Sequence, residues 1–413
     1  MKRQHSLSMN RAVDSVMRTL LSAPFCCNQT ARTRVSALRE CCAGSWPQLP
    51  DTRWLKLSRR FFLKQLVGAV LAALLCLPAA TAEPTIPPAP EGSFSIVVIP
   101  DTQKYLGRGT KAQPASTNEV TNAVLQQHTR WLVDNLDRQR IVFVSHVGDI
   151  VDKNVPEQWT VARQCMDRLH GRVPYGISPG NHDHGRATQT TLFQQFFGAA
   201  RFAGMTWYGG AFDGGHDPAA SGNNANSFQL FSAGGMEFVF LHLQCNAPDD
   251  VLQWADCVLR QHAGRRALVT THMGLGPLLK PKNEDEFTSG PKGLMQWSKC
   301  HGERGNTPEQ MWQKCFRKHP NLRLIFCGDQ SRTQAMRLTL QNDHGKPVHV
   351  LLSDYMQDRG DWLRVCRFLP GKNQIEVHTV DSRDGRLCEG TKLLPALAEH
   401  QFQLDYEMPS PKP

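Results

Sequence analysis

Residues 141–152, IVFVSHVGDIVD, and residues 175–183, YGISPGNHD, decide the fold of this chain. Each segment opens with apolar residues and closes in a short block of Gly, Asp, Asn or His. Residues 94–103, FSIVVIPDTQ, have the same form. Buried strands that end in polar residues are typical of an α/β sheet, in which ligands collect at the carboxyl ends of the strands. The three segments therefore predict a common polar site at one sheet edge.

The pattern between and after these segments alternates helices with strands. Helices are predicted at 117–138, 156–169, 190–197, 249–262 and 308–318. Further strands are predicted at 227–231, 236–243, 267–271 and 322–327, and then, without helices between them, at 336–341, 348–354, 362–369, 375–380 and 401–405. Residues 207–226 and 274–305 are expected to be long irregular insertions beside a pocket. This order favours two packed sheets with helices outside.

The positive charge of the chain lies almost entirely in its first 82 residues. The formal net charge is +10, and residues 1–82 carry twelve Lys and Arg against three Asp and Glu. The remaining residues are close to neutral, so their composition argues against a nucleic-acid-binding protein.

An export signal is predicted within this basic region. Residues 58–64, SRRFFLK, have the twin-arginine form, an apolar stretch follows at 66–77, and Ala80-Thr81-Ala82 resembles a cleavage site. We therefore expect a leader or over-extended start at 1–57, a signal peptide at 58–82 and a Pro-rich linker at 83–92. The main domain is expected at 93–381, with a tail at 382–413 that packs on it. The expected location is periplasmic or extracellular, reached through the twin-arginine machinery and without stable membrane insertion; the alternative is an uncleaved N-terminal anchor.

Eight of the thirteen cysteines follow the leader, and none forms a CxxC pair. This spacing argues against a zinc knuckle or a thioredoxin site. If disulfides form, the pairs expected from short spacing are Cys245 with Cys257 and Cys300 with Cys315. The alternative is that these residues are buried free thiols.

The ordered motifs resemble those of the calcineurin-like metallophosphoesterase superfamily. Asp101-Thr102-Gln103, then Gly148–Asp152 (GDIVD), Gly180–Asp183 (GNHD) and Thr271-His272 follow the family order D-x-H, GD-x-x-D, GNH[DE] and a lone His. The resemblance implies a four-layer α/β/β/α sandwich of two mixed sheets. It also implies a metal-dependent hydrolase of phosphate monoesters or diesters.

The resemblance assigns metal ligands to several of these residues. Asp149 resembles the carboxylate that bridges two cations, which lie roughly 3.5–4 Å apart in two-metal hydrolases. Asp101 resembles a ligand of the first metal, and Asn181 and His272 resemble ligands of the second. Of the catalytic residues, His182 resembles the general acid that protonates the leaving oxygen, and Asp152 the carboxylate that orients it.

Two motifs depart from the family pattern. Gln103 stands where His is common, and Gly328-Asp329-Gln330-Ser331 stands where G-H-x-H is expected. Gln103 and Asp329 would then supply oxygen ligands in place of imidazoles. Among Mn, Fe, Mg and Zn, this oxygen-rich set favours Mn²⁺ or Mg²⁺ over Zn²⁺.

Two alternatives follow from the altered last motif. One is an enzyme that holds a single metal ion firmly, and the other is a non-catalytic phosphate-binding member of the same fold. Outside the motifs, His242 on an apolar strand is expected to be a core histidine, and His146 is a candidate for supporting the site from behind.

Overall fold

The computed structural model describes residues 84–185, 189–214, 222–275 and 300–408. The chain divides into two compact units, 1–81 and 82–413, and every described residue belongs to the second. The predicted leader, twin-arginine box and cleavage site lie outside the described residues, as does most of the insertion expected at 274–305.

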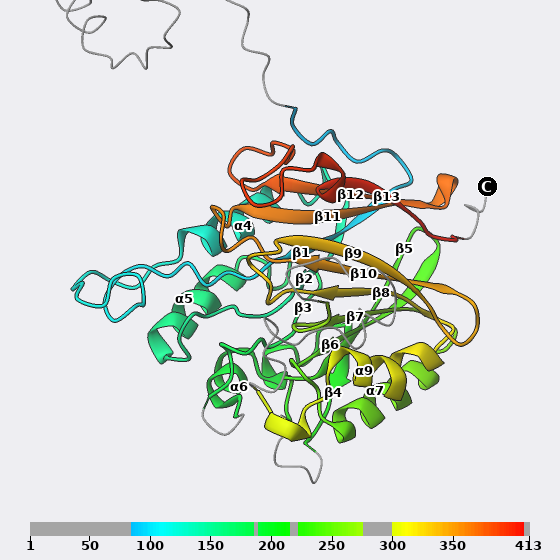
Figure 1. Ribbon diagram of the computed structural model, residues 1–413, viewed down its shortest axis with the longest axis horizontal. Helices are drawn as coiled ribbons and strands as arrows, with labels where there is room; N and C mark the ends of the chain where they lie inside the picture. The colour runs from blue at the N-terminus through cyan, green and yellow to red at the C-terminus, as the bar shows by residue number, and fades with distance from the viewer. Residues whose placement is uncertain (1–83, 186–188, 215–221, 276–299, 409–413) are drawn as a thin grey trace, which may run out of the picture. The chain divides into compact units, whose positions relative to one another are not determined.

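The first sheet has six strands in the order β13-β12-β11-β1-β2-β3 (Figure 1). Its strands are β1 (Phe94–Ile99), β2 (Ile141–His146), β3 (Tyr175–Ile177), β11 (Trp362–Leu369), β12 (Gln374–Asp381) and β13 (Gln401–Asp405). The neighbours β1, β2 and β3 run parallel, whereas β11, β12 and β13 add to β1 in antiparallel fashion. The sheet is therefore mixed.

The second sheet has seven strands in the order β4-β5-β6-β7-β8-β10-β9. Its strands are β4 (Tyr208–Ala211), β5 (Ser227–Ala233), β6 (Met236–Leu243), β7 (Arg266–Thr271), β8 (Leu322–Cys327), β9 (Ala335–Gln341) and β10 (Pro347–Ser353). Its four central strands, β6, β7, β8 and β10, are parallel, and the flanking strands are antiparallel.

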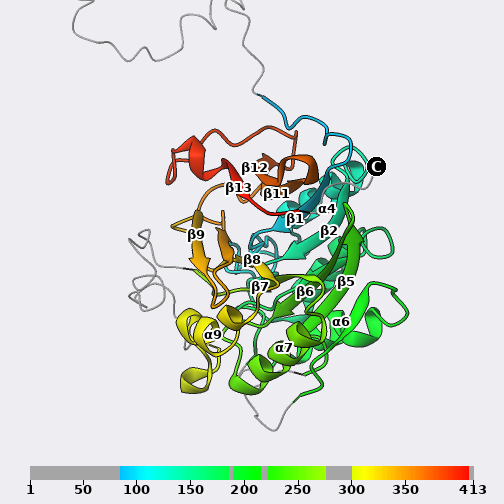
Figure 2. The same cartoon turned by 90° about the vertical axis from the view of Figure 1, so that its right-hand side faces the viewer.

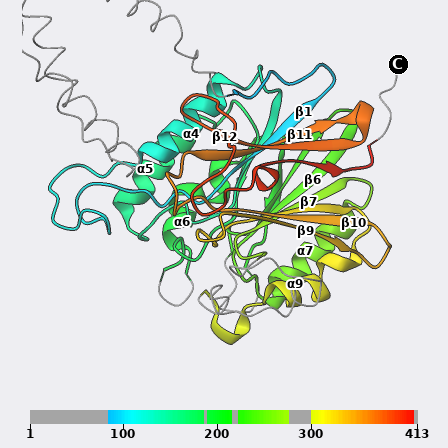
Figure 3. The ribbon, with the colours of Figure 1, turned by 45° about the horizontal axis from the view of Figure 1, so that its top comes forward.

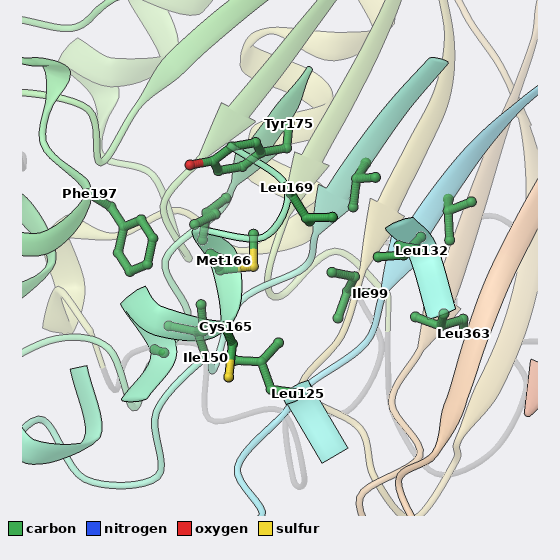
Figure 4. Close-up of a cluster of buried hydrophobic side chains, with 14 of the residues drawn as sticks. Ile99, Leu125, Leu132, Ile150, Cys165, Met166, Leu169, Tyr175, Phe197 and Leu363 are labelled. Carbon is green, nitrogen blue, oxygen red and sulfur yellow. The ribbon is translucent and has the colours of Figure 1, made fainter. Parts of the chain in front are cut away.

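Helices cover the outer face of each sheet, as Figures 2 and 3 show. The first sheet packs on α4 (Ala123–Asp134), α5 (Pro156–Met166) and α6 (Thr191–Phe197), and the second on α7 (Asp249–Gln261) and α9 (Pro308–Lys314). Alternation along β1 explains this layering. Val97 and Ile99 pack toward the helices, and Ile99 is labelled in Figure 4. Ile96 and Val98 pack toward the other sheet. The predicted four-layer α/β/β/α sandwich is confirmed.

Aromatic side chains fill the layer between the two sheets. Phe94 stacks on Phe368 with ring centroids 4.7 Å apart, and Phe143 lies 4.9 Å from Phe240. Each fully buried Phe contributes roughly 1.5–3 kcal/mol relative to an exposed one. His242 lies in the same layer, bonded to Gln229 and Ser145 at 2.7 and 2.9 Å, so the core histidine expected there is confirmed.

Two details differ from the sequence-based expectation, and a third was not addressed by it. The helix expected at 117–138 is shorter, because the Asn122 side chain accepts a bond from the Leu125 backbone N–H and so caps α4. Residues 208–211, expected in a loop, form the edge strand β4. The strand-rich C-terminal region also divides between the sheets: β9 and β10 join the second, and β11, β12 and β13 return beside β1.

Candidate metal centre

The site lies where the parallel strands of both sheets end. The loops after β1, β2 and β3 carry Asp101, Asp149 and residues 180–183. The loops after β7, β8 and β10 carry His272, Asp329 and Asp354. Carboxyl ends of parallel strands share an edge, and the sandwich brings the two edges together.

Asp149 and His272 form the centre of this cluster. The Asp149 carboxylate lies 3.4 Å from Nε2 of His272 and accepts a 2.8 Å hydrogen bond from the backbone N–H of His182. Nε2 of His272 also lies 4.0 Å from Asp101 and 3.7 Å from Asp329. Side chains from separate loops thus meet around one imidazole.

A hydrogen bond to the main chain sets the orientation of His272. Its Nδ1 lies 2.9 Å from the carbonyl oxygen of Val147 and donates to it, which leaves Nε2 facing the carboxylates. Histidines that bind metals usually have their other ring nitrogen held in this way. Burial lowers the pKa of His272, but Asp149 and Asp101 outweigh burial and raise it well above its ordinary range. The surroundings therefore favour a positive charge at this place.

The carboxylates carry more negative charge than one imidazole can balance. Burial, together with Asp354 and Asp149, raises the pKa of Asp101 well above its usual range. Burial and the neighbouring carboxylates raise the pKa of Asp354 to about 7. Oδ1 of Asp101 is buried and has no hydrogen-bond partner in the part of the chain that the structure describes. An unpaired buried carboxylate oxygen is costly, and a divalent cation would satisfy it, so the donor set fits a metal centre.

Two glycines let the loops approach one another. A Cβ at Gly328 would lie 2.2 Å from Oδ1 of Asp101, and a Cβ at Gly180 would lie 2.2 Å from Oδ1 of Asp149. Asp149 and Asp329 themselves have left-handed backbones, with φ of 50° and 65°. Asp tolerates this conformation better than most residues, and such strain is concentrated at functional sites.

His182 lies at the margin of the cluster, and its side chain is 23% exposed. Its Nδ1 is 2.8 Å from the backbone carbonyl of Asp152 but 3.8 Å from the Asp152 carboxylate. Lys111 bonds that carboxylate at 2.6 Å and lies 3.3 Å from the same ring nitrogen. The contact of Asp152 with His182 therefore runs through the main chain. Lys111 is a further neighbour of His182 that no motif in the sequence indicated.

Gln103 and Asn181 complete the predicted ligand set. The Gln103 amide nitrogen donates to the Asp149 carboxylate, so its oxygen would face a cation there only after the amide turns by 180°. Asn181 is buried between Gly180 and His182. Metal ligation by these two residues remains a prediction.

Asp354 is the acidic residue that the sequence analysis missed. It follows β10, an apolar strand, just as Asp101 follows β1. An acidic residue at the end of a buried strand was thus an available signal, although no family motif marked it.

His146 connects two of the site loops. Thr102 Oγ1 lies 3.1 Å from its Nε2, and Gly148 donates its backbone N–H to Nδ1 at 3.1 Å. Burial lowers the pKa of His146 to about 3, so the ring is neutral and can accept this bond. These contacts hold together the loops that carry Asp101 and Asp149, as expected of a residue that supports the site.

The predicted cysteine pairs are wrong. Cys245 is bonded to Cys300, whereas Cys257 is exposed and free and Cys315 is buried and free. Short spacing misled because Cys257 and Cys315 belong to the helical layer, away from the strand end that carries Cys245. The Cys245 backbone N–H donates to the carbonyl of Pro179 at 2.9 Å, so the disulfide lies directly beside the GNHD loop.

Asp329 provides a test of the altered last motif. Asp329→Asn keeps the side-chain shape and tolerates the left-handed backbone, but removes one charge that faces His272. We expect the Kd for Mn²⁺ to rise by at least about 10–100-fold, the range typical of residues that support a metal ligand. Calorimetric titration with Mn²⁺ measures this, with Ser331→Ala in the same motif as the matched control. Equal Mn²⁺ affinity in Asp329→Asn and the parent protein would place Asp329 outside the centre.

The sequence model of the calcineurin-like phosphoesterase family matches residues 94–332, which is more than half of the chain. The chain therefore belongs to the calcineurin-like phosphoesterase family. The match begins at β1 and ends just after the altered motif at 328–331, so it spans the site loops from Asp101 to Asp329.

A curated relative is the uncharacterized protein YvnB of Bacillus subtilis (strain 168), which is 26% identical over 306 residues. The alignment covers 71% of this chain but only 20% of that protein, so the chain spans about a fifth of the length of its relative.

Two solved structures share a weaker likeness. NAD nucleotidase (NadN) of Haemophilus influenzae has a TM-score of 0.36 and 11% identity, covering 67% of this chain and 48% of its own. GAP50, the anchor in the inner membrane complex of Plasmodium, has a TM-score of 0.38 and 11% identity, covering 78% of this chain and 90% of its own. At these values neither likeness bears on activity.

Proposed function

We propose that this member of the calcineurin-like phosphoesterase family is an exported hydrolase of small phosphate esters. The observation that carries the proposal is the buried group of Asp101, Asp149 and His272 at one edge of the sandwich, with Asp329 beside it. Within this group, Oδ1 of Asp101 has no hydrogen-bond partner among the described residues. His182 borders this group and is partly exposed, as a group that meets substrate must be.

The residues that would hold divalent cations are Asp101, Asp149, His272 and Asp329, joined by Asn181 and Gln103 through their amide oxygens and by Asp354. Asp149, at the centre of the cluster, is the proposed bridging ligand between two ions. Oxygen atoms predominate in this set, which favours Mn²⁺ or Mg²⁺. When bound, such ions polarise phosphoryl oxygens and lower the pKa of water.

His182 is the proposed general acid. The Asp152 carbonyl fixes its Nδ1–H, and this orientation leaves Nε2 available to pass a proton to the departing alkoxide. Lys111, beside the same ring, would attract the phosphoryl oxygens. A protein that only binds phosphate would have no use for this positioned imidazole, whereas an enzyme with a single metal ion would still use it.

A metal analysis combined with an ester panel tests the proposal. Protein stripped with chelator and reloaded with Mn²⁺ should hydrolyse at least one class among phosphate monoesters and diesters, and stripped protein should not. Metal-loaded protein that binds phosphate but turns over no ester would favour the phosphate-binding alternative.

Export through the twin-arginine machinery is the proposed route to the periplasm or cell exterior. Among the residues that the structure describes, no helix is both long and apolar enough to cross a membrane. Changing Arg59 and Arg60 together to Lys should leave the precursor in the cytoplasm, as cell fractionation would show. Normal export of the double variant, or a mature N-terminus before Leu66, would contradict the signal and favour the uncleaved anchor.

A further inference from the structure

A hollow of about 370 Å³ opens directly beside the metal centre. Gln103, Asp152 and Lys111 border it, and these are the residues that contact Asp149 and His182. Two other hollows of about 360 Å³, one at Trp131 and Arg383 and one at Gly235 and Glu407, include none of the site residues. Of these three hollows in the described residues, the first is therefore the one placed to receive part of a substrate.

The remaining wall of this hollow is almost wholly apolar. Its apolar residues are Tyr105, Leu106, Ala112, Ala123, Val124 and Met356. Leu106 is 46% exposed, a large exposure for an apolar side chain, whereas Tyr105 is buried with its hydroxyl bonded to the carbonyl of Ile150 at 2.8 Å. Lys104 also lines the hollow, but its ammonium is bound to the Asp358 carbonyl at 2.6 Å. The wall thus offers carbon surface and few free polar groups.

Residues that line the hollow are hydrogen-bonded to residues of the site. The backbone N–H of Met356 bonds the Asp354 carboxylate at 3.0 Å, and Gln103, next to Lys104, bonds Asp149. Asp152 and Lys111, which also line the hollow, contact Nδ1 of His182, the proposed proton donor. Gln103 donates to Oδ2 of Asp149, and Nε2 of His182 lies 4.0 Å from the same oxygen. A group bonded to the oxygen that Nε2 protonates would therefore lie beside Gln103, at the rim of the hollow.

We propose that this hollow binds the leaving group of the substrate, and that the preferred substrates are phosphate esters of alcohols with an apolar body. The proposal rests on the proposed hydrolysis for the assignment of the leaving-group side. Its physical basis is the burial of carbon surface, which is worth about 0.8 kcal/mol, or about fourfold in affinity, for each methylene removed from water. Lys111 at the rim would hold the phosphoryl end at the centre.

A series of n-alkylphosphonates, from methyl through butyl to octyl, tests the pocket without requiring turnover. In Mn²⁺-loaded protein, the Kd measured by calorimetry should fall with each added methylene, by up to about fourfold, until the hollow is filled. The matching n-alkyl phosphate esters keep the alkoxide chemistry nearly constant, so their kcat/KM should rise along the same series.

Ala123→Trp fills the hollow from the exposed first residue of α4 and should abolish the dependence of Kd on chain length. Ala112→Trp fills it from a different loop, so a folding defect in one variant leaves the other informative. Arg130→Trp, exposed on the same helix but outside the hollow, is the matched control and should keep the dependence.

The outcomes separate this proposal from the proposed function. A Kd that is independent of chain length in the parent protein, or a dependence that survives both tryptophan variants, would overturn the pocket. A chain-length dependence lost in both variants, with no ester hydrolysed, would support the pocket and contradict the hydrolase.

Discussion

His182→Ala is expected to lower turnover by on the order of 10²–10⁴, the usual contribution of general acid catalysis, while the metals stay bound. A proton donor acts in the transition state, whereas metal ligands act already in the ground state. The loss should be smaller for esters with acidic leaving groups, such as a nitrophenolate, because these depart without a proton. Steady-state rates for aryl and alkyl esters, with metal content measured in parallel, give the result.

Asp152→Asn serves as the comparison for His182. It keeps the backbone carbonyl that holds Nδ1 of His182, but removes the carboxylate bound to Lys111. We expect the same leaving-group dependence in a milder form. An equal loss for aryl and alkyl esters in His182→Ala would exclude the imidazole as proton donor.

Asp149→Asn is expected to cause the largest loss of metal. Its carboxylate lies at the centre of the cluster, within 3.4 Å of His272, and it is the proposed ligand of both ions. The amide keeps the shape of the side chain and tolerates φ of 50°, so the change is one of charge. Metal content and activity should fall further than in Gln103→Ala. The loss of metal affinity should exceed about 10–100-fold, the range typical of a residue that only supports a ligand.

Two controls isolate the role of Asp149. Asp343→Asn makes the same chemical change at an exposed ion pair with Arg317 and should leave metal content unchanged. Circular dichroism of the metal-free Asp149→Asn protein should show an intact fold, because removing one charge from a repulsive carboxylate cluster does not cost packing. Full metal content and rate in Asp149→Asn would sink the bridging assignment.

Much of the site could be predicted because its residues follow strands directly. Asp101, Asp149 and His272 each end an apolar run, and the run fixes both the strand and the edge at which the next residue lies. The structure brings these three together with Asp329, as the order of motifs implied. The same rule, applied to Val348–Ser353, would have found Asp354.

Lys111 and the disulfide could not be predicted in this way. Lys111 reaches Asp152 from a long loop, and nothing in local sequence fixes where such a loop returns. Cys245 and Cys300 are 55 residues apart, and they meet beside His184, which directly follows the GNHD turn. Spacing alone favoured Cys257 and Cys315 as partners, but these two residues belong to the helical layer and lie away from the disulfide.

The sequence by itself determined most of the strands, the helices and most of the residues at the carboxyl edge, because hydrophobic periodicity and turn chemistry are local properties. The four-layer class followed from the resemblance of the motifs to the family. Tertiary structure alone decided which sheet each late strand joins, how the main chain of Asp152 holds His182, and where the apolar hollow opens. These features depend on the closing of the two sheets over one aromatic layer, which places Met356 and Ala123 beside the same site. Contacts between residues so far apart in the chain are set by the packing of whole layers, and no local pattern encodes them.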